Sequence, residues 1–377
     1  MALPLTEQLR KLPAAARETL ARYHFDEPRF LELAARLRDG ADDDGVVHGR
    51  IEPPYSGDIT QLPDPGSEQS ARLKQAGDAE FAAGRCALVV LAGGMATRMG
   101  GVVKALVEAL PGKSFLDLRL AEVDAFAERY GAAPPLWLMT SDATDEKTRE
   151  ALAGRLDGER VAAFTQFLSL RLTPQGDIFL DQDGQPNLHA PGHGDLPDAL
   201  RKSGLLDRFI ARGGRSLMLT NLDNLGGTLD PAILGFHLQH GKPLTSEAVD
   251  KLENDRGGIP VRVDGKLRVL EEFRIPPTFD PRSVRVFNTN VFHVDARALR
   301  DLDMDWRYYT VKKKVGSKEV VQFERILNEI SSELATQYLH MPRVGPHARF
   351  LPVKDAPELE QRRPEIELVA RARGFLQ

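Results

Sequence analysis

The chain has 377 residues, a formal net charge of −5 at pH 7 and a hydrophobic content of 42%. This length exceeds that of one small core, and the slightly acidic balance argues against a protein that binds nucleic acid through a broad basic face. Cys86 is the only cysteine, so an intrachain disulfide and a cysteine-based zinc cluster are both excluded. The sequence lacks a signal peptide and any apolar run of about 18 residues. We therefore expect a cytoplasmic protein that does not bind membranes.

Helices are predicted near the N-terminus, where leucines and alanines recur at helical spacing between residues 5 and 37. Residues 40–67 are rich in Pro, Gly and Asp, which is typical of a loop. Asp42, Asp43 and Asp44 are interpreted as a solvated acidic stretch, because a bare charge run lacks converging metal ligands. These features predict an N-terminal helical segment with its linker, residues 1–66, and a main domain, residues 67–377.

Apolar runs alternate with helix-like stretches through the main domain. A helix predicted at residues 68–83 precedes apolar runs at 87–92, 136–139, 217–219 and 284–287, and residues 358–377 predict one charged helix. This alternation indicates βαβ units and an α/β fold with a mostly parallel central sheet. Such sheets bind ligands at the carboxyl ends of their strands, where the polar blocks of this sequence fall.

Residues 86–104, CALVVLAGGMATRMGGVVK, predict a buried strand that ends at a glycine pair. Gly93 and Gly94 allow backbone N–H groups to approach an anion without an obstructing Cβ, and Arg98 and Lys104 supply positive charge. Neither the dinucleotide pattern G-x-G-x-x-G nor the triphosphate pattern G-x-x-x-x-G-K-[ST] fits this segment. The segment is interpreted as a phosphate-binding turn, and the alternative is an ordinary turn with two surface cations.

LAGGMATRMG with Lys104 resembles the activation loop of the sugar nucleotidyltransferases, whose pattern is roughly L-x-G-G-x-G-T-R-x-G-x-x-x-P-K. Five further blocks resemble, in order, those of the UDP-glucose pyrophosphorylase family, which is related to the UDP-N-acetylglucosamine pyrophosphorylases. They are FTQF with Gln166, APGHGDLPDALRKSGLLD at 190–207, TNLDNLGG at 220–227, FNTN at 287–290 and RFLPVK at 349–354. The resemblance covers about residues 67–355. It implies a Rossmann-like sheet of the sugar nucleotidyltransferase (GT-A-like) type.

Many relatives continue into a C-terminal β-helix that mediates assembly. This chain ends 23 residues after Lys354, so we expect no β-helix, and we expect a monomer.

The resemblance also implies a reaction. A uridylyltransferase of this family joins UTP and glucose 1-phosphate to form UDP-glucose and pyrophosphate, by in-line attack on the α-phosphorus with Mg²⁺ as cofactor. The attacking phosphate is already an anion at neutral pH, because its second pKa lies near 6. Cations and alignment are therefore needed rather than a general base. Alternatives are a UDP-N-acetylglucosamine or broad-specificity UDP-sugar pyrophosphorylase, and a non-catalytic relative that binds UDP-sugars.

The resemblance assigns roles to individual residues. The catalytic residues are Lys104, Lys354 and Arg98, and the metal ligand is Asp223. The nucleotide-binding residues are Leu91, Ala92, Gly93, Gly94, Thr97, Gln166, Gly192 and His193. The sugar-binding residues are Asn221, Gly258, Glu271, Asn288, Asn290 and Phe350. From residue type alone, a solvent-facing glutamine is the better interpretation of Gln166. The alternatives are a turn residue for Asp223 and an exposed ion-pairing lysine for Lys354.

The sequence departs from the family pattern in two places. Ala96 stands where glycine is usual, which would be costly if that position required a positive φ angle. Val103 precedes Lys104 where proline is usual, in a loop that is one residue shorter. Both departures bear on the reach of Lys104.

Overall fold

The computed structural model describes residues 3–40 and 45–376. The three aspartates at 42–44 lie outside the described residues. Helices α1 (Leu5–Arg10), α2 (Ala14–Arg22) and α3 (Glu27–Arg38) come first, as predicted, and the short strands β1 (Ile51–Glu52) and β2 (Ile59–Gln61) lie in the segment read as a loop. Helix α4 (Glu68–Ala82) then begins after Ser67, whose side chain accepts a hydrogen bond from the Ser70 N–H at 3.1 Å.

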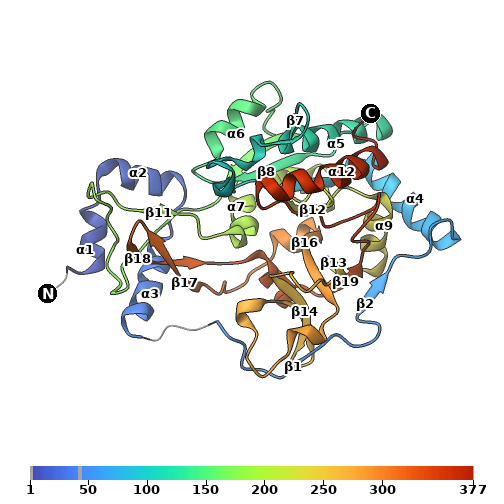
Figure 1. The fold of residues 1–377 in the computed structure, drawn as a ribbon. Coiled ribbons are helices and arrows are strands. Elements are labelled where there is room, and N and C mark those ends of the chain that lie inside the picture. The colour runs from blue at the N-terminus through green and yellow to red at the C-terminus, as the bar shows by residue number, and fades with distance from the viewer. Residues whose placement is uncertain (1–2, 41–44, 377) are drawn as a thin grey trace.

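An eight-stranded sheet forms the centre of the molecule (Figure 1). Its order is β2, β19 (Thr336–His340), β13 (Leu244–Asp250), β16 (Val286–Asp295), β12 (Ser216–Asn221), β3 (Cys86–Leu91), β8 (Leu136–Thr140) and β9 (Val161–Thr165). Neighbouring strands are parallel except at β16, which runs antiparallel to both β13 and β12. The mostly parallel α/β sheet predicted from the sequence is confirmed.

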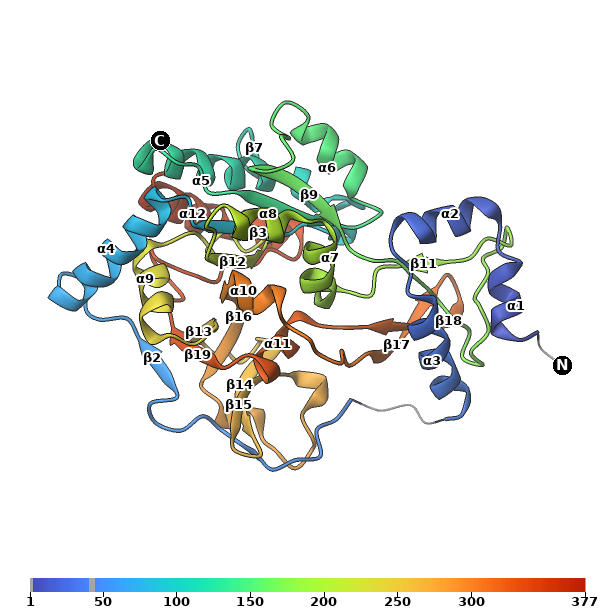
Figure 2. The same ribbon diagram turned by 180° about the vertical axis from the view of Figure 1, so that it is seen from behind.

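The alternation of side chains along β3 explains why helices cover both faces of this sheet. Cys86, Leu88 and Val90 face one apolar core, and Ala87 and Val89 face another. The first core is completed by α4, α5 (Phe115–Tyr130), α6 (Asp145–Leu152), α9 (Pro231–His240) and α12 (Ala356–Ala372). The second is completed by α7 (Leu196–Lys202), α8 (Leu205–Ala211), α10 (Ala296–Arg300) and α11 (Ile330–Glu333), which Figure 2 shows from behind.

The N-terminal helices pack against two later segments of the chain. Hairpin β17–β18 (Tyr309–Val315 and Lys318–Glu324) reaches out from the sheet towards α1–α3, and β10 (Ser169–Leu170) pairs with β11 (Leu188–His189) beside it (Figures 1 and 2). Leu9, Phe30, Leu170 and Phe323 share one buried cluster. The N-terminal helices are therefore anchored on segments inserted into the main domain.

The remaining strands form small sheets near the central one. Strand β1 pairs with β14 (Gly258–Val263), which pairs with β15 (Lys266–Glu271). Strands β4 (Met95–Ala96) and β5 (Val102–Val103) close the glycine turn, and β6 (Glu108–Leu110) pairs with β7 (Lys113–Ser114). Within residues 3–40 and 45–376, every helix is too short or too polar to span a lipid bilayer.

Two glycines allow α4 and α9 to cross at very short range. A Cβ atom on Gly77 would lie 1.9 Å from the Pro231 carbonyl oxygen, and one on Gly235 would lie 1.9 Å from the Leu73 carbonyl oxygen. Any side chain at either position would force the helices apart.

The position of FNTN differs from the prediction. The sequence placed Asn288 and Asn290 after a strand at 284–287, whereas both lie inside β16. Because β16 is antiparallel, its first half lies at the same edge of the sheet as the end of β12, and the Asn290 side chain donates to Asn221 Oδ1 at 2.9 Å. Asn288 and Asn290 therefore lie at the predicted edge of the sheet, but in the first half of a strand rather than after its end.

Candidate active site

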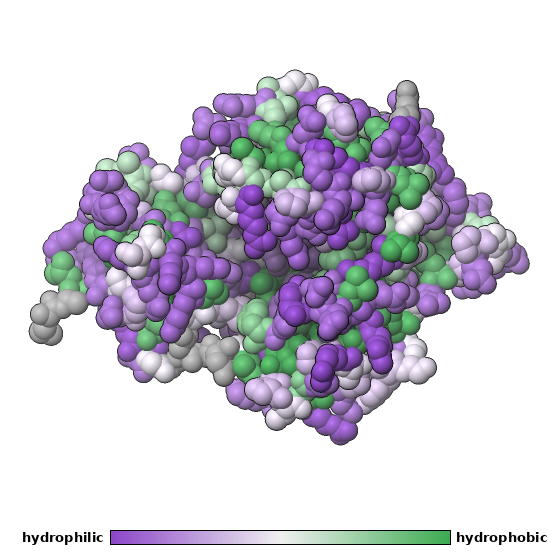
Figure 3. Space-filling view, viewed as in Figure 1, coloured by the Kyte–Doolittle hydropathy of each residue, from purple (hydrophilic) through white to green (hydrophobic). Residues whose placement is uncertain are grey.

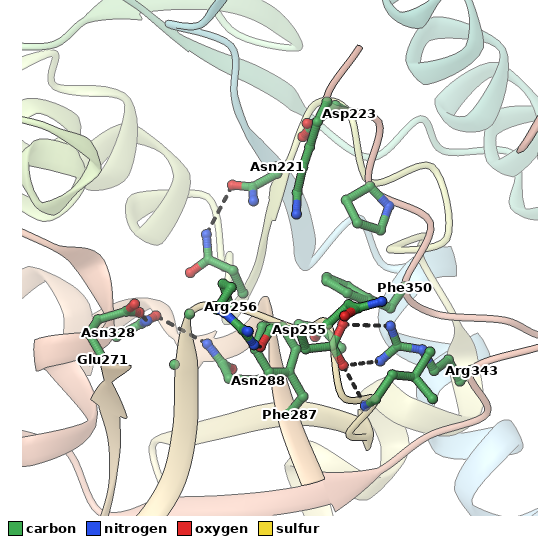
Figure 4. A pocket seen from close by; sticks show the side chains of 18 of the residues that line it. Asn221, Asp223, Asp255, Arg256, Glu271, Phe287, Asn288, Asn328, Arg343 and Phe350 are labelled. Carbon is green, nitrogen blue, oxygen red and sulfur yellow. Dashed lines mark hydrogen bonds and ion pairs between the residues drawn. The ribbon is translucent and has the colours of Figure 1, made fainter. Parts of the chain in front are cut away.

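A cleft of about 510 Å³ opens at the carboxyl edge of β12. The hollow lies near the centre of the face seen in Figure 3. In Figure 4, Glu271, Asn328 and Asn288 gather at one end of this cleft and Arg343, Asp255 and Phe350 at the other, with Asn221 and Asp223 above them. The cleft thus combines carboxylates, amides and cations from segments far apart in the sequence.

Asp223 lies two residues beyond β12 and lines the cleft. Its Oδ2 atom is 2.5 Å from the Lys104 Nζ atom, and the two side chains are 19% and 17% exposed. Lys104 is placed for this contact by the glycine turn, because its N–H donates to the Gly94 carbonyl at 3.2 Å. The predicted metal ligand and one predicted cation therefore meet directly.

A buried arginine holds the loop that carries Asp223. Arg119 of α5 is fully buried and donates to the carbonyl oxygens of Asn221 (3.1 Å), Asn224 (2.7 Å) and Gly227 (2.8 Å). Its charge is balanced by Glu122 at 2.9 Å. The rigid guanidinium group binds three carbonyl oxygens of one loop. These contacts fix the backbone on both sides of Asp223.

The same loop is tied to the segment that carries Lys354. The Asn224 side chain donates to the Arg349 carbonyl at 3.0 Å and accepts from the Leu351 N–H at 2.7 Å. Arg349 binds both carboxylate oxygens of Glu247 at 2.6 and 2.7 Å. Burial works to raise the pKa of Glu247, but Arg349 and His293 hold it at about 2, so this buried pair is fully charged.

Lys354 lines the cleft with an exposed side chain at the start of α12. Its N–H donates to Glu358 Oε2 at 2.7 Å, and Asp355 caps the helix by accepting from the Glu358 N–H. Lys354 therefore lines the cleft directly, whereas Lys104 reaches it only through its contact with Asp223.

The glycine turn resolves the question raised by Ala96. Ala96 is buried and has φ −78° and ψ 67°, which alanine adopts without strain, while Gly100 and Gly101 take the positive φ angles of 87° and 72°. The expected cost of Ala96 is therefore absent. Val103 has φ −64°, an angle that proline also takes, so the proline of the family pattern would fit at this position.

Five predicted nucleotide-binding residues lie at or directly after the ends of β3 and β9: Leu91, Ala92, Gly93, Gly94 and Gln166. Leu91 lies opposite Asn221 in the register of β3 and β12, and Ala92 donates to the Met139 carbonyl at 2.8 Å. A Cβ on Gly93 would lie 2.7 Å from Gln166 Oε1, so the amide of Gln166 packs directly over this glycine. Gln166 is buried, which excludes the solvent-facing interpretation.

Gly192 and His193 approach from the opposite wall. Gly192 has φ +108°, and a Cβ there would lie 2.8 Å from the Arg325 carbonyl oxygen. His193 lines the cleft, and its Nδ1 accepts from the Leu327 N–H at 2.9 Å. Burial lowers the pKa of His193 to about 4. The ring is therefore neutral at pH 7 and carries its proton on Nε2 as a hydrogen-bond donor.

All six predicted sugar-binding residues line the cleft: Asn221, Gly258, Glu271, Asn288, Asn290 and Phe350. Burial raises the pKa of Glu271 to about 7. The Oδ1 atom of Asn290 is buried and has no hydrogen-bond partner among the residues that the structure describes. A buried acceptor without a partner is costly, and a ligand hydroxyl would satisfy it.

Of the predicted site residues, Asp223, Lys354, His193 and the six sugar-binding residues line the cleft, whereas Lys104, Arg98 and the other nucleotide-binding residues do not. Thr97 and Arg98 lie exposed on a 3-10 turn of residues Thr97–Met99. Conversely, Asn328, Arg343 and Asp255 line it although the sequence did not single them out. Asn328 follows an apolar stretch without a recognisable block, and Arg343 reaches Asp255 across 88 residues at 2.8 Å.

The donors available for a metal ion are few. Within residues 3–40 and 45–376, no three His, Cys, Asp or Glu side chains gather so that they could hold one. Asp223 offers one carboxylate at the edge of an open cleft. This suits Mg²⁺, which is commonly held by one or two carboxylates together with substrate phosphates and water.

Comparison with known proteins decides the family. The model of the UTP–glucose-1-phosphate uridylyltransferase family matches residues 29–363. The chain belongs to this family. The UTP–glucose-1-phosphate uridylyltransferase of Saccharomyces cerevisiae is 30% identical over 295 residues, which cover 73% of this chain and 58% of that protein. That of Dictyostelium discoideum is 29% identical over 297 residues, with 74% and 58% covered. The chain thus spans about 58% of the length of these curated relatives.

Solved structures share the fold. A UDP-N-acetylglucosamine pyrophosphorylase from Trypanosoma brucei matches with a TM-score of 0.75 at 18% identity, covering 98% of this chain and 85% of that one. A mutant UDP-glucose pyrophosphorylase from Leishmania major matches with a TM-score of 0.71 at 23% identity, covering 93% and 79%. At these identities the likeness establishes the α/β fold alone.

Proposed function

We propose that the protein is a uridylyltransferase that forms UDP-glucose and pyrophosphate from UTP and glucose 1-phosphate. The observation that carries this proposal is the convergence of Asp223, Lys104 and Lys354 on one cleft whose far end is lined by amides. The family of the chain supports it. The GT-A-like type of the sheet, a monomeric state and a cytoplasmic location belong to the same proposal.

The cations answer the main obstacle of the reaction, which is the repulsion between two phosphorylated substrates. Lys104 is held by the glycine turn, where a triphosphate would bind, and Lys354 lines the cleft from the segment that leads into α12. Both ammonium groups would offset negative charge as the bond to pyrophosphate breaks. Asp223 would hold Mg²⁺, which would supply further positive charge for the phosphate groups.

The lining of the cleft suits a hexose. Asn221, Asn290 and Glu271 offer hydrogen-bond donors and acceptors, and the ring of Phe350, at the end opposite Glu271, offers an apolar face. Sugar hydroxyls both donate and accept, so amides and a carboxylate are suitable partners. Gln166, buried over Gly93, has an amide that complements the imide edge of uracil.

Pyrophosphate release tests the proposal. Purified protein with Mg²⁺ and UTP is offered glucose 1-phosphate, galactose 1-phosphate and N-acetylglucosamine 1-phosphate in parallel. Release that is fastest with glucose 1-phosphate supports the proposal, and faster release with N-acetylglucosamine 1-phosphate favours the alternative substrate. Binding of UDP-glucose in calorimetry without any release would indicate a non-catalytic relative. The unstrained backbone at Ala96 and the Lys104–Asp223 contact favour catalysis.

A further inference from the structure

Asn328 connects two side chains of the amide-lined end of the cleft. It lies on a 3-10 turn, Leu327–Glu329, and is 3% exposed. Its Nδ2 donates to Glu271 Oε1, and its Oδ1 accepts from Asn288 Nδ2 at 3.3 Å. The other end of the Asn288 amide accepts from Ser246 Oγ at 3.1 Å. A hydrogen-bonded chain therefore runs from Ser246 through Asn288 and Asn328 to Glu271.

We propose that Asn328 is a positioning residue that fixes Glu271 and Asn288 for recognition of the hexose, an inference that rests on the proposed function. Asn328 engages one oxygen of Glu271 and leaves Oε2 to accept from a sugar hydroxyl. It also fixes which end of the Asn288 amide faces it, because only the NH₂ group can donate to Asn328 Oδ1. Each side chain is thereby held in one orientation before the ligand arrives.

The backbone beneath the pair is shaped to receive it. A Cβ on Gly258 would lie 2.9 Å from Glu271 Oε1 and 3.0 Å from Asn328 Nδ2. A side chain at this position would therefore displace the hydrogen bond between Glu271 and Asn328. The hydrogen bond between Glu271 and Asn328 therefore requires glycine at position 258.

The segment that carries Asn328 is held on both sides. Arg325 binds Asp195 at 2.6 Å, and both residues are almost fully buried. The N–H of Leu327 donates to His193, and Glu329 pairs with Arg274. These contacts fix the backbone that carries the amide of Asn328. The same segment orients His193 on the nucleotide side. Residues 325–329 therefore connect the two substrate subsites.

Asn328→Asp tests this role, because it keeps the shape of the side chain and replaces the donor with a carboxylate oxygen. The measurement is made at about pH 8.5, well above the raised pKa of Glu271, so that two carboxylates face each other and Glu271 turns away. We expect calorimetry to show about 10- to 100-fold weaker binding of UDP-glucose, the range for a lost hydrogen bond to a charged group. Binding of UDP should stay within about twofold, because UDP lacks the hexose. Asn328→Ala removes the donor without adding charge and should give the same selective loss.

A reversed hydrogen bond provides the rescue. In the double variant Asn328→Asp with Glu271→Gln, the introduced amide can donate to the introduced carboxylate, so the contact re-forms with opposite polarity. We expect the double variant to recover at least part of the UDP-glucose affinity lost by Asn328→Asp. A merely structural role would instead lower the melting temperature and weaken UDP and UDP-glucose equally.

Two results would overturn the positioning role: equal loss of UDP and UDP-glucose binding, or a double variant weaker than both single variants. The proposed function is judged separately, by pyrophosphate release from the unaltered protein. If release is absent while UDP-glucose binds, the binding comparison still decides the role of Asn328.

Discussion

The ammonium of Lys104 and the carboxylate of Asp223 lie 2.5 Å apart although 119 positions separate them in the sequence. Their meeting follows from the sheet, because β3 and β12 are parallel neighbours in which Leu91 lies opposite Asn221. The loops that leave these two strands must then emerge side by side. Asp223 is thus a charged, partly exposed group whose charge is balanced by a lysine in the free protein.

Asp223→Asn removes the only carboxylate that the proposed metal site takes from this loop. We expect turnover to fall by at least about 100-fold, because stabilisation of charge in the transition state is usually the largest catalytic contribution. The melting temperature should change little, since both side chains are partly exposed. Initial rates across a Mg²⁺ titration provide the measurement, and Glu360→Gln on the exposed face of α12 is the matched control. Unchanged rates and Mg²⁺ dependence would exclude Asp223 as the ligand.

Lys354→Ala removes the lysine that lines the cleft immediately before α12. Turnover should fall by about 100- to 1000-fold with little change in stability, because the side chain is exposed and packs no core. Lys314→Ala in the exposed hairpin strand β17 is the control and should keep full activity. Steady-state pyrophosphate release measures both variants, and activity of Lys354→Ala within about threefold of the unaltered protein would contradict the assignment.

Strong local patterns made much of this architecture predictable. The run before Gly93 is apolar on both faces of β3, so its burial and parallel pairing follow from composition. The helix predicted at residues 68–83 agrees with α4, and the polar block after Leu219 placed Asp223 at a strand end. In each case the signal lies within a few consecutive residues.

Contacts between residues far apart in the chain could not be predicted from local sequence patterns. The direction of β16 depends on its two neighbours, so the sequence placed a strand end where Asn288 and Asn290 lie within a strand. Asn328 has no local sequence signature, because its role depends on hydrogen bonds to Glu271 and Asn288, which are 57 and 40 positions away. The φ angle of Ala96 likewise depends on the pairing of β4 with β5 rather than on the residue type.

Gly77→Ala tests the close crossing of α4 and α9. The added methyl group would meet the Pro231 carbonyl oxygen at 1.9 Å, so the helices must separate. We expect the free energy of unfolding to fall by about 1–3 kcal/mol, the usual cost of overpacking, although alanine favours helices over glycine. Denaturant unfolding measures the change. Gly154→Ala is the control, because a Cβ there meets nothing within 4 Å, and equal stability of the two variants would show that the crossing is loose.

Glu271→Gln should change how stability depends on pH. Burial raises the pKa of Glu271 to about 7, above its ordinary value of 4.5, so the folded protein holds this proton at pH values where the unfolded chain has lost it. The contribution of Glu271 to stability is therefore fully present below about pH 4.5 and declines as the pH rises to 7. The variant lacks this decline. Its melting temperature, relative to that of the unaltered protein without ligand, should rise steadily between pH 4.5 and 7. A constant difference over this range would contradict the raised pKa.

Gly93→Ala tests whether the glycine turn and Gln166 act together on the nucleotide. The added methyl group would lie 2.7 Å from Gln166 Oε1, the free end of a flexible side chain, so the amide can swing aside and the fold should survive. Its hydrogen-bonding edge would then no longer be aligned. We expect the KM for UTP to rise about tenfold, the effect of losing one to two well-placed hydrogen bonds, with the KM for glucose 1-phosphate unchanged. Gly154→Ala serves again as the control. A KM for UTP within twofold of normal, at an unchanged melting temperature, would show that Gln166 does not orient the base.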